Sequence, residues 1–347
     1  MKAVVKTQRG DGYIELADVD EPSPKPGWVV LEVTGAGICG TDIHILHDEH
    51  PYSPPVTLGH EFAGKIVEVG PEVEGWQVTD RVVCEPHVGA CGVCHLCRRG
   101  FAQLCAHKKA PGLAIDGALA KYVAVPTHLL HRVPDEVSDR AAAVCEPTAI
   151  SVSALERVEV NAGETIVVLG PGPIGLITAM VARAMGAGHV VVVGRSSSQR
   201  RLDMGARLGF ETWNNEKIDV VKAALDITDG RGVDVVVDTS GAVGAIASGV
   251  NMLGRRGRMC ALGMSGHERV EFPWDEALFR AIELHFSFSS SYTSWDGALS
   301  LMRSGAVNVE PLTTVFPLQE WEGAFRAVEN RDVVKAILTP QPLHDEH

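Results

Sequence analysis

The sequence predicts a two-domain α/β protein, in which a mostly β domain precedes a parallel β-sheet wrapped by helices. Three observations support this fold class. The chain has 347 residues, which exceeds the size at which one hydrophobic core usually stops growing. Its first 150 residues contain short β-rich runs separated by Pro and Gly clusters. From about Asn161, continuous apolar runs alternate with helical stretches, a pattern typical of strands that are buried on both faces.

The composition is that of an ordinary soluble globular enzyme, with 45% hydrophobic and 22% charged residues. No window approaches the roughly 18 apolar residues that would span a bilayer, so we expect no membrane insertion. The net charge is -13 and no run is rich in Lys and Arg, which argues against a nucleic-acid partner. The amino terminus reads directly as a strand, without an export signal, so we expect a cytoplasmic location.

We assign residues 1–150 to the first domain on the basis of strand-like runs such as 28–33 and 65–69. Residues 151–285 form the second domain, a doubly wound parallel sheet of the Rossmann type. Its elements are strand-like runs at 165–169, 190–193, 233–237 and 258–262, and helical stretches at 174–185 and 199–208. After about Phe286 the alternation fades, and we expect 286–347 to complete the first domain. This last region contains helical stretches at 295–303 and 321–330 and a final strand at 333–338.

A short segment of the first domain has the spacing Cys-x2-Cys-x2-Cys-x7-Cys, formed by Cys91, Cys94, Cys97 and Cys105. Four thiolates close a tetrahedral zinc site with no open position, so this site is structural. The alternative is a pair of disulfides. It is disfavoured because the chain has no secretory signal and its other cysteines are scattered singly, which suits a reducing compartment. These other cysteines are Cys39, Cys84, Cys145 and Cys260.

A glycine-rich loop at 170–175 fits G-x-G-x-x-G and lies between a predicted strand and a predicted helix. Its first glycine allows the tight turn, the second allows the backbone to approach a pyrophosphate, and the third allows close helix packing. The helix N-terminus adds amide donors. The residues expected to bind a dinucleotide are Gly170, Gly172, Pro173, Ile174 and Gly175.

The next predicted strand ends at Gly194, where an NAD-preferring site would carry Asp or Glu for the ribose 2′-hydroxyl. Gly194 leaves room there, Arg195 and Arg200 can pair with a phosphate, and Ser196 can donate a hydrogen bond. We therefore predict that NADP is preferred over NAD. The alternative is that both arginines are solvated on a surface turn. Two further candidate cofactor-binding residues are Leu262 and Gly263.

A second zinc site is predicted from Cys39, His60 and one of two glutamates, Glu61 or Glu146. One thiolate and one carboxylate neutralise Zn²⁺ and leave a position open, so a zinc ion there keeps its Lewis acidity. From spacing alone, Cys39 could instead be a small buried hydrophobe, and the two glutamates could be solvated surface charges.

Over nearly its whole length the chain resembles the zinc-containing medium-chain dehydrogenases and reductases, in the branch of sorbitol (polyol) and threonine dehydrogenases. The matching motifs, in the family's order, are Gly-Ile-Cys-Gly-Thr-Asp-Ile-His at 37–44, Gly-His-Glu at 59–61, the four cysteines, Glu146-Pro147, and the loop at 170–175. The resemblance implies a GroES-like mostly-β catalytic domain followed by the Rossmann domain. It also implies one catalytic and one structural zinc per chain.

The same resemblance assigns roles to individual residues. Cys39 and His60 would ligate the catalytic zinc, and Glu61 or Glu146 would complete its shell directly or through water. Two further residues of the 37–44 segment would move the proton: Thr41 would accept it from the substrate hydroxyl and His44 would relay it towards solvent. Asp42 would orient His60.

One segment departs from the family pattern. Where polyol dehydrogenases offer an Arg and a Tyr to sugar hydroxyls, this chain has Ser-Ser-Ser-Tyr-Thr-Ser at 289–294. These hydroxyls could still bind a polyhydroxylated substrate, but a smaller secondary alcohol, a diol or a hydroxy acid also fits.

We therefore predict a zinc-dependent oxidoreductase that transfers hydride between a secondary alcohol or polyol, or the matching ketone, and NADP(H). The alternatives are a threonine- or hydroxy-acid-type dehydrogenase using NAD(P), a zinc-free quinone or enoyl reductase, and a non-catalytic nucleotide-binding redox sensor. The resemblance implies a homodimer or homotetramer.

Overall fold

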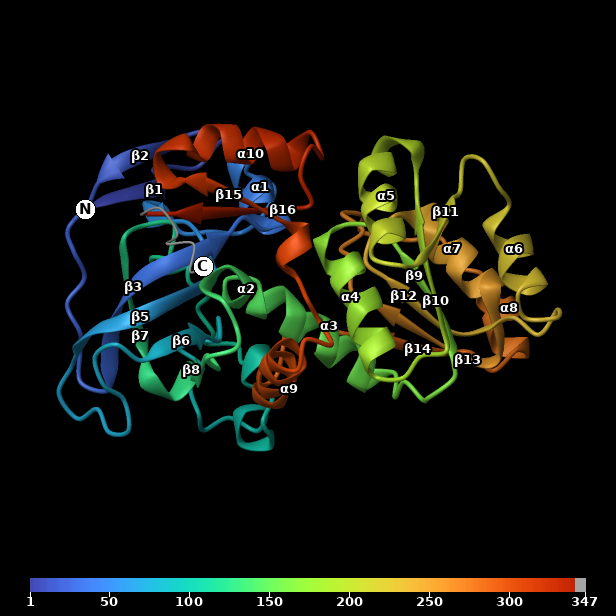
Figure 1. The fold of residues 1–347 in the computed structure, drawn as a ribbon, viewed down its shortest axis with the longest axis horizontal. Coiled ribbons are helices and arrows are strands. Elements are labelled where there is room, and N and C mark those ends of the chain that lie inside the picture. Colours follow the sequence, from blue (N-terminus) through green and yellow to red (C-terminus); the bar gives the residue numbers. More distant parts are fainter. Residues whose placement is uncertain (341–347) are drawn as a thin grey trace. The chain divides into compact units, whose positions relative to one another are not determined.

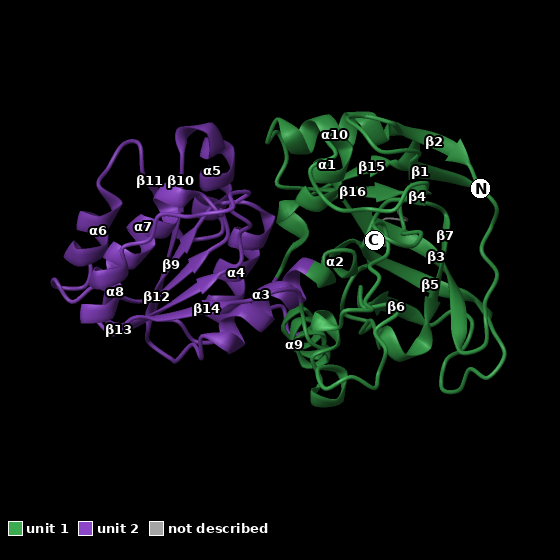
Figure 2. Ribbon diagram, turned by 180° about the vertical axis from the view of Figure 1, so that it is seen from behind, with its two compact units in different colours: residues 1–146, 290–303, 308–347 green, residues 147–289, 304–307 purple. Residues whose placement is uncertain are grey.

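A computed structural model describes residues 1–340 and divides the chain into two compact units (Figure 2). Unit 1 contains residues 1–146, 290–303 and the described part of 308–347, and unit 2 contains residues 147–289 and 304–307. The chain therefore passes into unit 2 after Glu146, whereas the sequence analysis placed this domain boundary after residue 150. Residues 341–347, which end the predicted range 286–347, lie outside the described residues.

Unit 1 is mostly β, as predicted, and Figure 1 shows its strands on the blue-to-green and the red parts of the chain. Its larger sheet has the order β15-β16-β3-β5-β6-β8, with β7 paired to β3, and a smaller sheet has the order β2-β1-β4. The strands are β1 (Lys2–Lys6), β2 (Ile14–Asp18), β3 (Trp28–Gly37), β4 (Val56–Thr57), β5 (Glu61–Val69), β6 (Arg81–Cys84), β7 (Tyr122–Pro126), β8 (Leu130–Arg132), β15 (Thr313–Pro317) and β16 (Lys335–Thr339).

The helices of unit 1 are short and lie beside these sheets. The α-helices are α1 (Gly40–Leu46), α2 (Asp139–Ala142), α9 (Tyr292–Arg303) and α10 (Trp321–Glu329). The 3-10 turns are η1 (Cys97–Arg99), η2 (Ala102–Leu104), η3 (Thr127–Leu129), η5 (Glu310–Leu312) and η6 (Leu318–Glu320). Helix α3 (Cys145–Arg157) begins in unit 1 and continues into unit 2.

Unit 2 is a six-stranded sheet in which every pairing is parallel, in the order β11-β10-β9-β12-β13-β14. Counted along the unit, this is the order 3-2-1-4-5-6 of dinucleotide-binding sheets, so the predicted Rossmann domain is confirmed. The strands are β9 (Thr165–Leu169), β10 (His189–Gly194), β11 (Glu211–Asn214), β12 (Val233–Asp238), β13 (Leu253–Ala261) and β14 (Glu283–Phe286). The helices are α4 (Pro173–Ala184), η4 (Ser196–Ser198), α5 (Gln199–Arg207), α6 (Val220–Asp226), α7 (Val243–Met252) and α8 (Trp274–Phe279).

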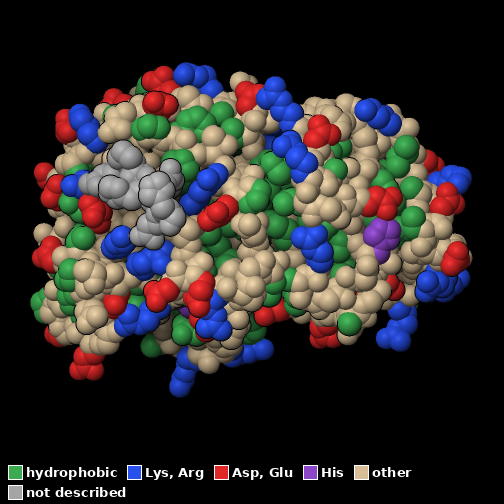
Figure 3. Space-filling view, in the orientation of Figure 1, with side chains coloured by type: hydrophobic (Ala, Val, Ile, Leu, Met, Phe, Trp, Pro, Cys, Tyr) green, Lys and Arg blue, Asp and Glu red, His purple; other side chains and the backbone are tan. Residues whose placement is uncertain are grey.

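The continuous apolar runs are explained by burial of the inner strands on both faces. In β9, β10 and β12 almost every residue is buried, with no alternation between faces. Helix α4 packs on β9 and β10, and α7 packs on β12 and β13. Among residues 1–340, no helix is both long and apolar enough to cross a membrane. On the face drawn in Figure 3, acidic and basic side chains are interspersed.

Candidate active site

The sheet register of unit 1 gathers the predicted metal ligands at one end of β3 and β5. Gly37, the last residue of β3, lies opposite Glu61, the first residue of β5. Cys39 follows β3 and is the N-cap residue of α1, and His60 directly precedes β5. Ligand atoms of Cys39, His60 and Glu61 all lie within 4.8 Å of one another. A bound metal could therefore contact all three.

Glu146 lies near this group but outside it, since its carboxylate is not within 4.8 Å of all three ligand atoms. It is buried in the first turn of α3. Burial raises the pKa of Glu146 to about 7, and the negative charge of Glu61 adds to the shift. The two predicted glutamate ligands are therefore close enough to interact electrostatically.

Lys335, on β16, is a residue of this site that the sequence analysis missed. Its ammonium group pairs with the Glu61 carboxylate and also donates a hydrogen bond to the Ile38 carbonyl at 2.9 Å. Desolvation lowers the pKa of Lys335, but Glu61 and Cys39 outweigh this effect, so the pKa is raised and the lysine stays charged. One signal was present in the sequence: this lysine interrupts the otherwise apolar run at 333–338 that was predicted as the final strand.

Asp42 is fully buried in α1 and adjoins two of the candidate ligand residues, Cys39 and His60. Its Oδ2 accepts a hydrogen bond from the Cys39 backbone N–H at 2.8 Å. Its Oδ1 is 3.8 Å from Nδ1 of His60, and these two atoms have no other partner. Because Nδ1 is the ring nitrogen that faces Asp42, Nε2 of His60 remains available for a metal.

Thr41 and His44 occupy one face of α1, three residues apart. The Cys39 thiol is 3.7 Å from the Thr41 hydroxyl, so Thr41 adjoins the candidate ligands. His44 is exposed, and its Nδ1 is 2.8 Å from Oε2 of Glu49. A half-buried hydroxyl and a solvent-facing imidazole are thus aligned on the same short helix.

The donor set fits a divalent cation. Desolvation and the charge of Glu61 raise the pKa of Cys39, and desolvation also raises the pKa of Asp42. Several buried acidic groups are thus close together, and Lys335, paired with Glu61, offsets part of their charge. A divalent cation would compensate the remainder. One thiolate, one imidazole and one carboxylate make the three-ligand set of an open zinc site.

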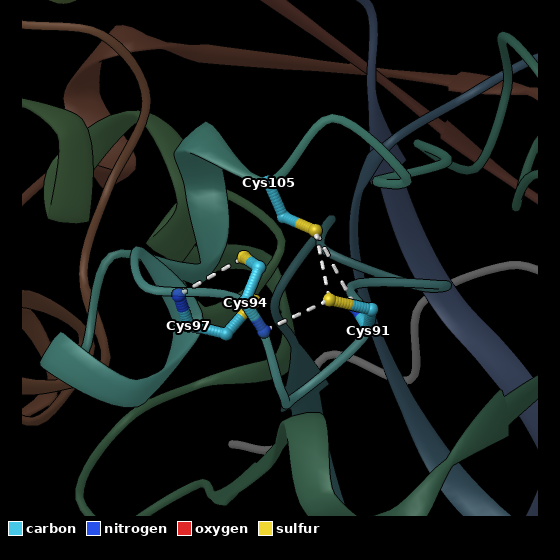
Figure 4. A group of neighbouring side chains, drawn as sticks. All are labelled: Cys91, Cys94, Cys97 and Cys105. Carbon is cyan, nitrogen blue, oxygen red and sulfur yellow. Dashed lines mark hydrogen bonds between the residues drawn. The ribbon is translucent and has the colours of Figure 1, made fainter.

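The four-cysteine lobe is drawn in Figure 4, with the four side chains converging. Sγ of Cys105 is 3.7 Å from Sγ of Cys91, close to the edge of about 3.8 Å of a tetrahedron with Zn–S bonds of about 2.3 Å. Backbone N–H groups of Cys91, Cys94 and Cys97 donate to neighbouring sulfurs. Such bonds lower the pKa of Cys105 to about 6, which favours the thiolate. The lobe fits a closed metal site.

The glycine-rich loop has the predicted strand-turn-helix setting, between β9 and α4. Gly170 has a φ of +107°, which favours glycine. A Cβ on Gly175 would lie 1.8 Å from the Gly170 carbonyl oxygen, so this helix approach requires glycine. A Cβ on Gly172 would meet nothing within 4 Å, which leaves open space where a pyrophosphate could approach. Pro173 and Ile174 open α4.

Gly194 is the last residue of β10. The sequence analysis expected free room at this position, whereas the structure shows close packing there. A Cβ there would lie 2.7 Å from Cγ of Pro171, so an Asp or Glu would clash unless Pro171 moved. Arg195 and Ser196 follow on the surface, and both interact with Glu216. Arg200 is exposed on α5.

Leu262 and Gly263 follow β13, and their N–H groups bond to the Asp238 carbonyl at the end of β12. They share the carboxyl edge of the parallel sheet with Gly170 and Gly194, where dinucleotides bind in such folds.

The predicted serine-rich loop is different in the structure, because helix α9 begins at Tyr292. Ser290 and Ser294 are fully buried. The Ser290 hydroxyl accepts a hydrogen bond from Nε1 of Trp295 at 2.9 Å, and the Ser294 hydroxyl donates to the Ser291 carbonyl. These two hydroxyls therefore take part in hydrogen bonds within the fold, whereas Tyr292 of the same segment is exposed, and a role of this segment in binding a polyhydroxylated substrate stays a prediction.

Comparisons with known proteins agree with this geometry. Residues 25–135 match the alcohol dehydrogenase GroES-like domain, and residues 173–304 match the zinc-binding dehydrogenase family. A sorbitol dehydrogenase of Halalkalibacterium halodurans is 38% identical over 98% of this chain and 99% of its own. An L-threonine 3-dehydrogenase of Pyrococcus horikoshii is 36% identical over 90% of each chain. A zinc-binding dehydrogenase structure of Sinorhizobium meliloti bound to NADP has a TM-score of 0.91 at 31% identity, covering 98% of this chain and 99% of its own.

The chain thus belongs to the zinc-containing medium-chain dehydrogenase family, in its polyol and threonine dehydrogenase branch, with a GroES-like and a Rossmann domain. It is an NAD(P)-dependent oxidoreductase of the alcohol dehydrogenase class.

Proposed function

We propose that the enzyme oxidises a secondary alcohol of the polyol class, or reduces the matching ketone, with NADP(H) preferred over NAD(H). The observation that carries this proposal is the grouping of Cys39, His60 and Glu61 ligand atoms within 4.8 Å, with Thr41 beside them. Such a group serves an open metal site, and the sorbitol dehydrogenase relative supports a polyol substrate.

Cys39 and His60 would hold a catalytic zinc, with Glu61 or Glu146 completing the shell, and the four-cysteine lobe would hold a structural zinc. The bound zinc would supply Lewis acidity that lowers the pKa of an alcohol, and the bound nicotinamide would supply the hydride acceptor. Asp42 would fix the orientation of the His60 ring, because Oδ1 of Asp42 faces Nδ1 of His60.

The proton would leave through α1. Thr41 lies next to the ligand group and would accept the proton of the substrate hydroxyl while passing on its own. His44 lies on the same helix face, is exposed, and would carry the proton to solvent. The pairing of His44 with Glu49 would hold the imidazole in place.

The dinucleotide would bind along the carboxyl edge of the parallel sheet. Gly170, Gly172 and Gly175, with Pro173 and Ile174, would receive the pyrophosphate at the N-terminus of α4, and Leu262 and Gly263 would line the same edge. The preference for NADP would rest on Arg195, Ser196 and Arg200, with no carboxylate at Gly194 to bind a ribose 2′-hydroxyl.

A homodimer formed through β14 would complete the enzyme. β14 lies at the end of its sheet, and no other described strand pairs with its outer side. Large apolar side chains near it are exposed, and a second copy would bury them. β13, which contains the predicted strand 258–262, lies inside the sheet between β12 and β14. The exposed side chains are Trp274, Leu278, Phe279, Leu284 and Phe286. The eight cysteines, all free, suit a reducing compartment, so we propose a cytoplasmic location.

The test is steady-state oxidation of a panel of polyols, diols, sugar acids and threonine with NADP and with NAD. We expect the highest kcat/KM for a polyol or diol with NADP. Threonine as the best substrate would favour the threonine-type alternative, and a higher kcat/KM with NAD would refute the NADP preference. Thr41→Val should lower kcat by about 10²-fold or more, with activity recovered in Thr41→Ser. A Cys39→Ser variant equal to wild type on every substrate would support a non-catalytic sensor.

A further inference from the structure

Glu216, in the loop after β11, contacts the residues proposed to bind the 2′-phosphate of NADP. Its Oε2 accepts a hydrogen bond from the Ser196 backbone N–H at 3.0 Å, and its Oε1 is 3.4 Å from Nε of Arg195. The parallel register of β10 and β11 explains this proximity, because Gly194 lies opposite Asn214. A carboxylate therefore uses two of the donors that an anionic ligand would need.

The position of Glu216 is held by its neighbours. The Glu216 backbone N–H donates to Oδ1 of Asn214 at 3.0 Å, and Nδ2 of Asn214 donates to the Ser196 hydroxyl at 3.1 Å. Asn214 thus ties the Glu216 loop to the Ser196 turn. Hydrogen bonds from Ser196, above all from its side chain, lower the pKa of Glu216, so the carboxylate is ionised at neutral pH.

We propose that Glu216 is a specificity-determining residue that occupies the anion-binding donors of the Arg195–Ser196 turn and must be displaced by the 2′-phosphate of NADP. This inference rests on the proposed function, in which this turn binds that phosphate. A carboxylate and a phosphate dianion cannot share the same donors, and their charges repel at such short range. NAD carries no charge at this position and does not compete with Glu216. The ratio of NADP to NAD affinity is therefore set partly by Glu216.

Gly194 alone cannot set this ratio, because a side chain there is blocked by Pro171. The carboxylate of Glu216, from the loop after β11, contacts the turn instead, and it accepts hydrogen bonds from Ser196 and Arg195. Arg195 is 67% exposed and Glu216 is 45% exposed, so both side chains can rearrange when a phosphate arrives.

The test is calorimetric binding of 2′,5′-ADP and 5′-AMP to the full chain, since these probes differ only in the 2′-phosphate. We expect Glu216→Gln, which keeps the shape but removes the charge, to bind 2′,5′-ADP about tenfold more tightly than wild type. Its affinity for 5′-AMP should stay within about twofold. The matched control is Glu211→Gln, which removes one charge at the other end of β11 and should bind both probes as wild type does.

Unchanged or weaker binding of 2′,5′-ADP by Glu216→Gln would overturn the inference. Weaker 5′-AMP binding with unchanged 2′,5′-ADP binding would also overturn it, since the carboxylate would then serve the ribose hydroxyl. Arg195→Ala separates this from the proposed function. If Arg195→Ala weakens 2′,5′-ADP binding while Glu216→Gln has no effect, only the role of Glu216 fails. If Arg195→Ala has no effect either, the proposed phosphate site itself fails.

Discussion

The ammonium group of Lys335 on β16 pairs with the carboxylate of Glu61 on β5, and β3 lies between these two strands in the sheet. Both side chains are only 2% exposed. A Cβ on Gly37, at the end of β3, would lie 2.5 Å from Oε2 of Glu61 and 2.8 Å from Cε of Lys335, so a larger residue there would require these two side chains to shift. A carboxylate already paired with an ammonium group gives less charge to a metal. Pairing with Lys335 therefore makes Glu61 a weaker zinc ligand relative to Glu146 than it would be without the lysine.

Replacing Lys335 with methionine should destabilise the metal-free protein strongly. The change leaves the Glu61 carboxylate buried without its partner, which costs about 3–5 kcal/mol in the free energy of unfolding. Zinc should recover part of this loss, because a bound cation compensates the same carboxylate. Urea unfolding of the metal-free and zinc-loaded variants measures both effects.

Lys222→Met provides the matched control, because this lysine pairs with Asp226 on the surface, where it is 70% exposed. Its loss should leave the urea midpoint of unfolding close to that of wild type, because an exposed ion pair is screened by water. The double variant Lys335→Met, Glu61→Gln should be more stable than Lys335→Met alone. Wild-type stability of metal-free Lys335→Met would show that the pair contributes nothing.

Zinc content should separate the two metal sites. Purified wild-type enzyme should contain about two zinc ions per chain by mass spectrometry, whereas Cys39→Ser and Cys105→Ser should each contain about one. Only Cys105→Ser should also lower the midpoint of thermal unfolding by a large amount, because a closed four-thiolate site supports folding of its lobe.

The control for the zinc measurement is Cys260→Ser, which changes a buried thiol on β13 remote from either ligand group in sequence and sheet. It should retain about two zinc ions. A wild-type enzyme with one zinc that is lost in Cys105→Ser but kept in Cys39→Ser would mean that only the structural site binds metal.

The sequence predicted the parts of the fold whose signals are local. Strands β9, β10 and β12 were found because burial on both faces leaves a continuous apolar run, and the residues of the Cys39 segment were found because they adjoin along the chain. β13 was predicted to start at Arg258 but starts at Leu253. The prediction missed its first residues because they are rich in Gly and Arg, which are typical of a loop. Helix α9 likewise begins at Tyr292, within a serine-rich stretch.

Pairings across distant strands were not predictable from the sequence. Lys335 meets Glu61 only because β16 and β5 both flank β3, and sheet order cannot be read from hydrophobic periodicity. Glu216 meets Ser196 for the same kind of reason, through the register of β10 and β11. The hydrogen bond between Ser290 and Trp295 depends on where α9 begins, and the ends of a helix are its least predictable feature.

The second and third glycines of the cofactor loop, Gly172 and Gly175, should respond differently to alanine. Gly172→Ala should change the free energy of unfolding by less than about 0.5 kcal/mol, because its Cβ meets nothing within 4 Å. It should weaken NADP binding by on the order of tenfold or more, since the methyl group enters the space of the pyrophosphate. Gly175→Ala should destabilise the fold itself, because its Cβ would lie 1.8 Å from the Gly170 carbonyl oxygen. Calorimetric titration with NADP and urea unfolding distinguish the two effects.

Gly323→Ala is the control for the cofactor loop, since this glycine lies in α10 of unit 1 and its Cβ would also meet nothing within 4 Å. It should leave NADP binding unchanged and stabilise the helix by up to about 1 kcal/mol. NADP binding by Gly172→Ala equal to that of wild type would show that the pyrophosphate does not approach this glycine.

His47, the residue after α1, lies between Asp11 and Glu329 of α10, and we call these three residues the histidine clamp. The clamp should make the stability of unit 1 depend on pH. Nδ1 of His47 is 2.8 Å from Asp11, and its Nε2 is 2.7 Å from Glu329. A neutral imidazole has one N–H, so only the protonated ring can donate to both carboxylates. Hydrogen bonding to Glu329 and then to Asp11 raises the pKa of His47 above its usual 6.5.

Because the pKa is raised in the folded state, the contribution of the clamp is complete below the unfolded value near 6.5 and disappears as the pH rises through the higher folded value. His47→Gln should therefore lower the free energy of unfolding at pH 5.5–6, by less than about 1 kcal/mol because the ring is 40% exposed, and by less above that window. In a Glu329→Gln background the same substitution should have a smaller pH-dependent effect, since one acceptor is gone. A loss that grows with increasing pH would contradict the clamp.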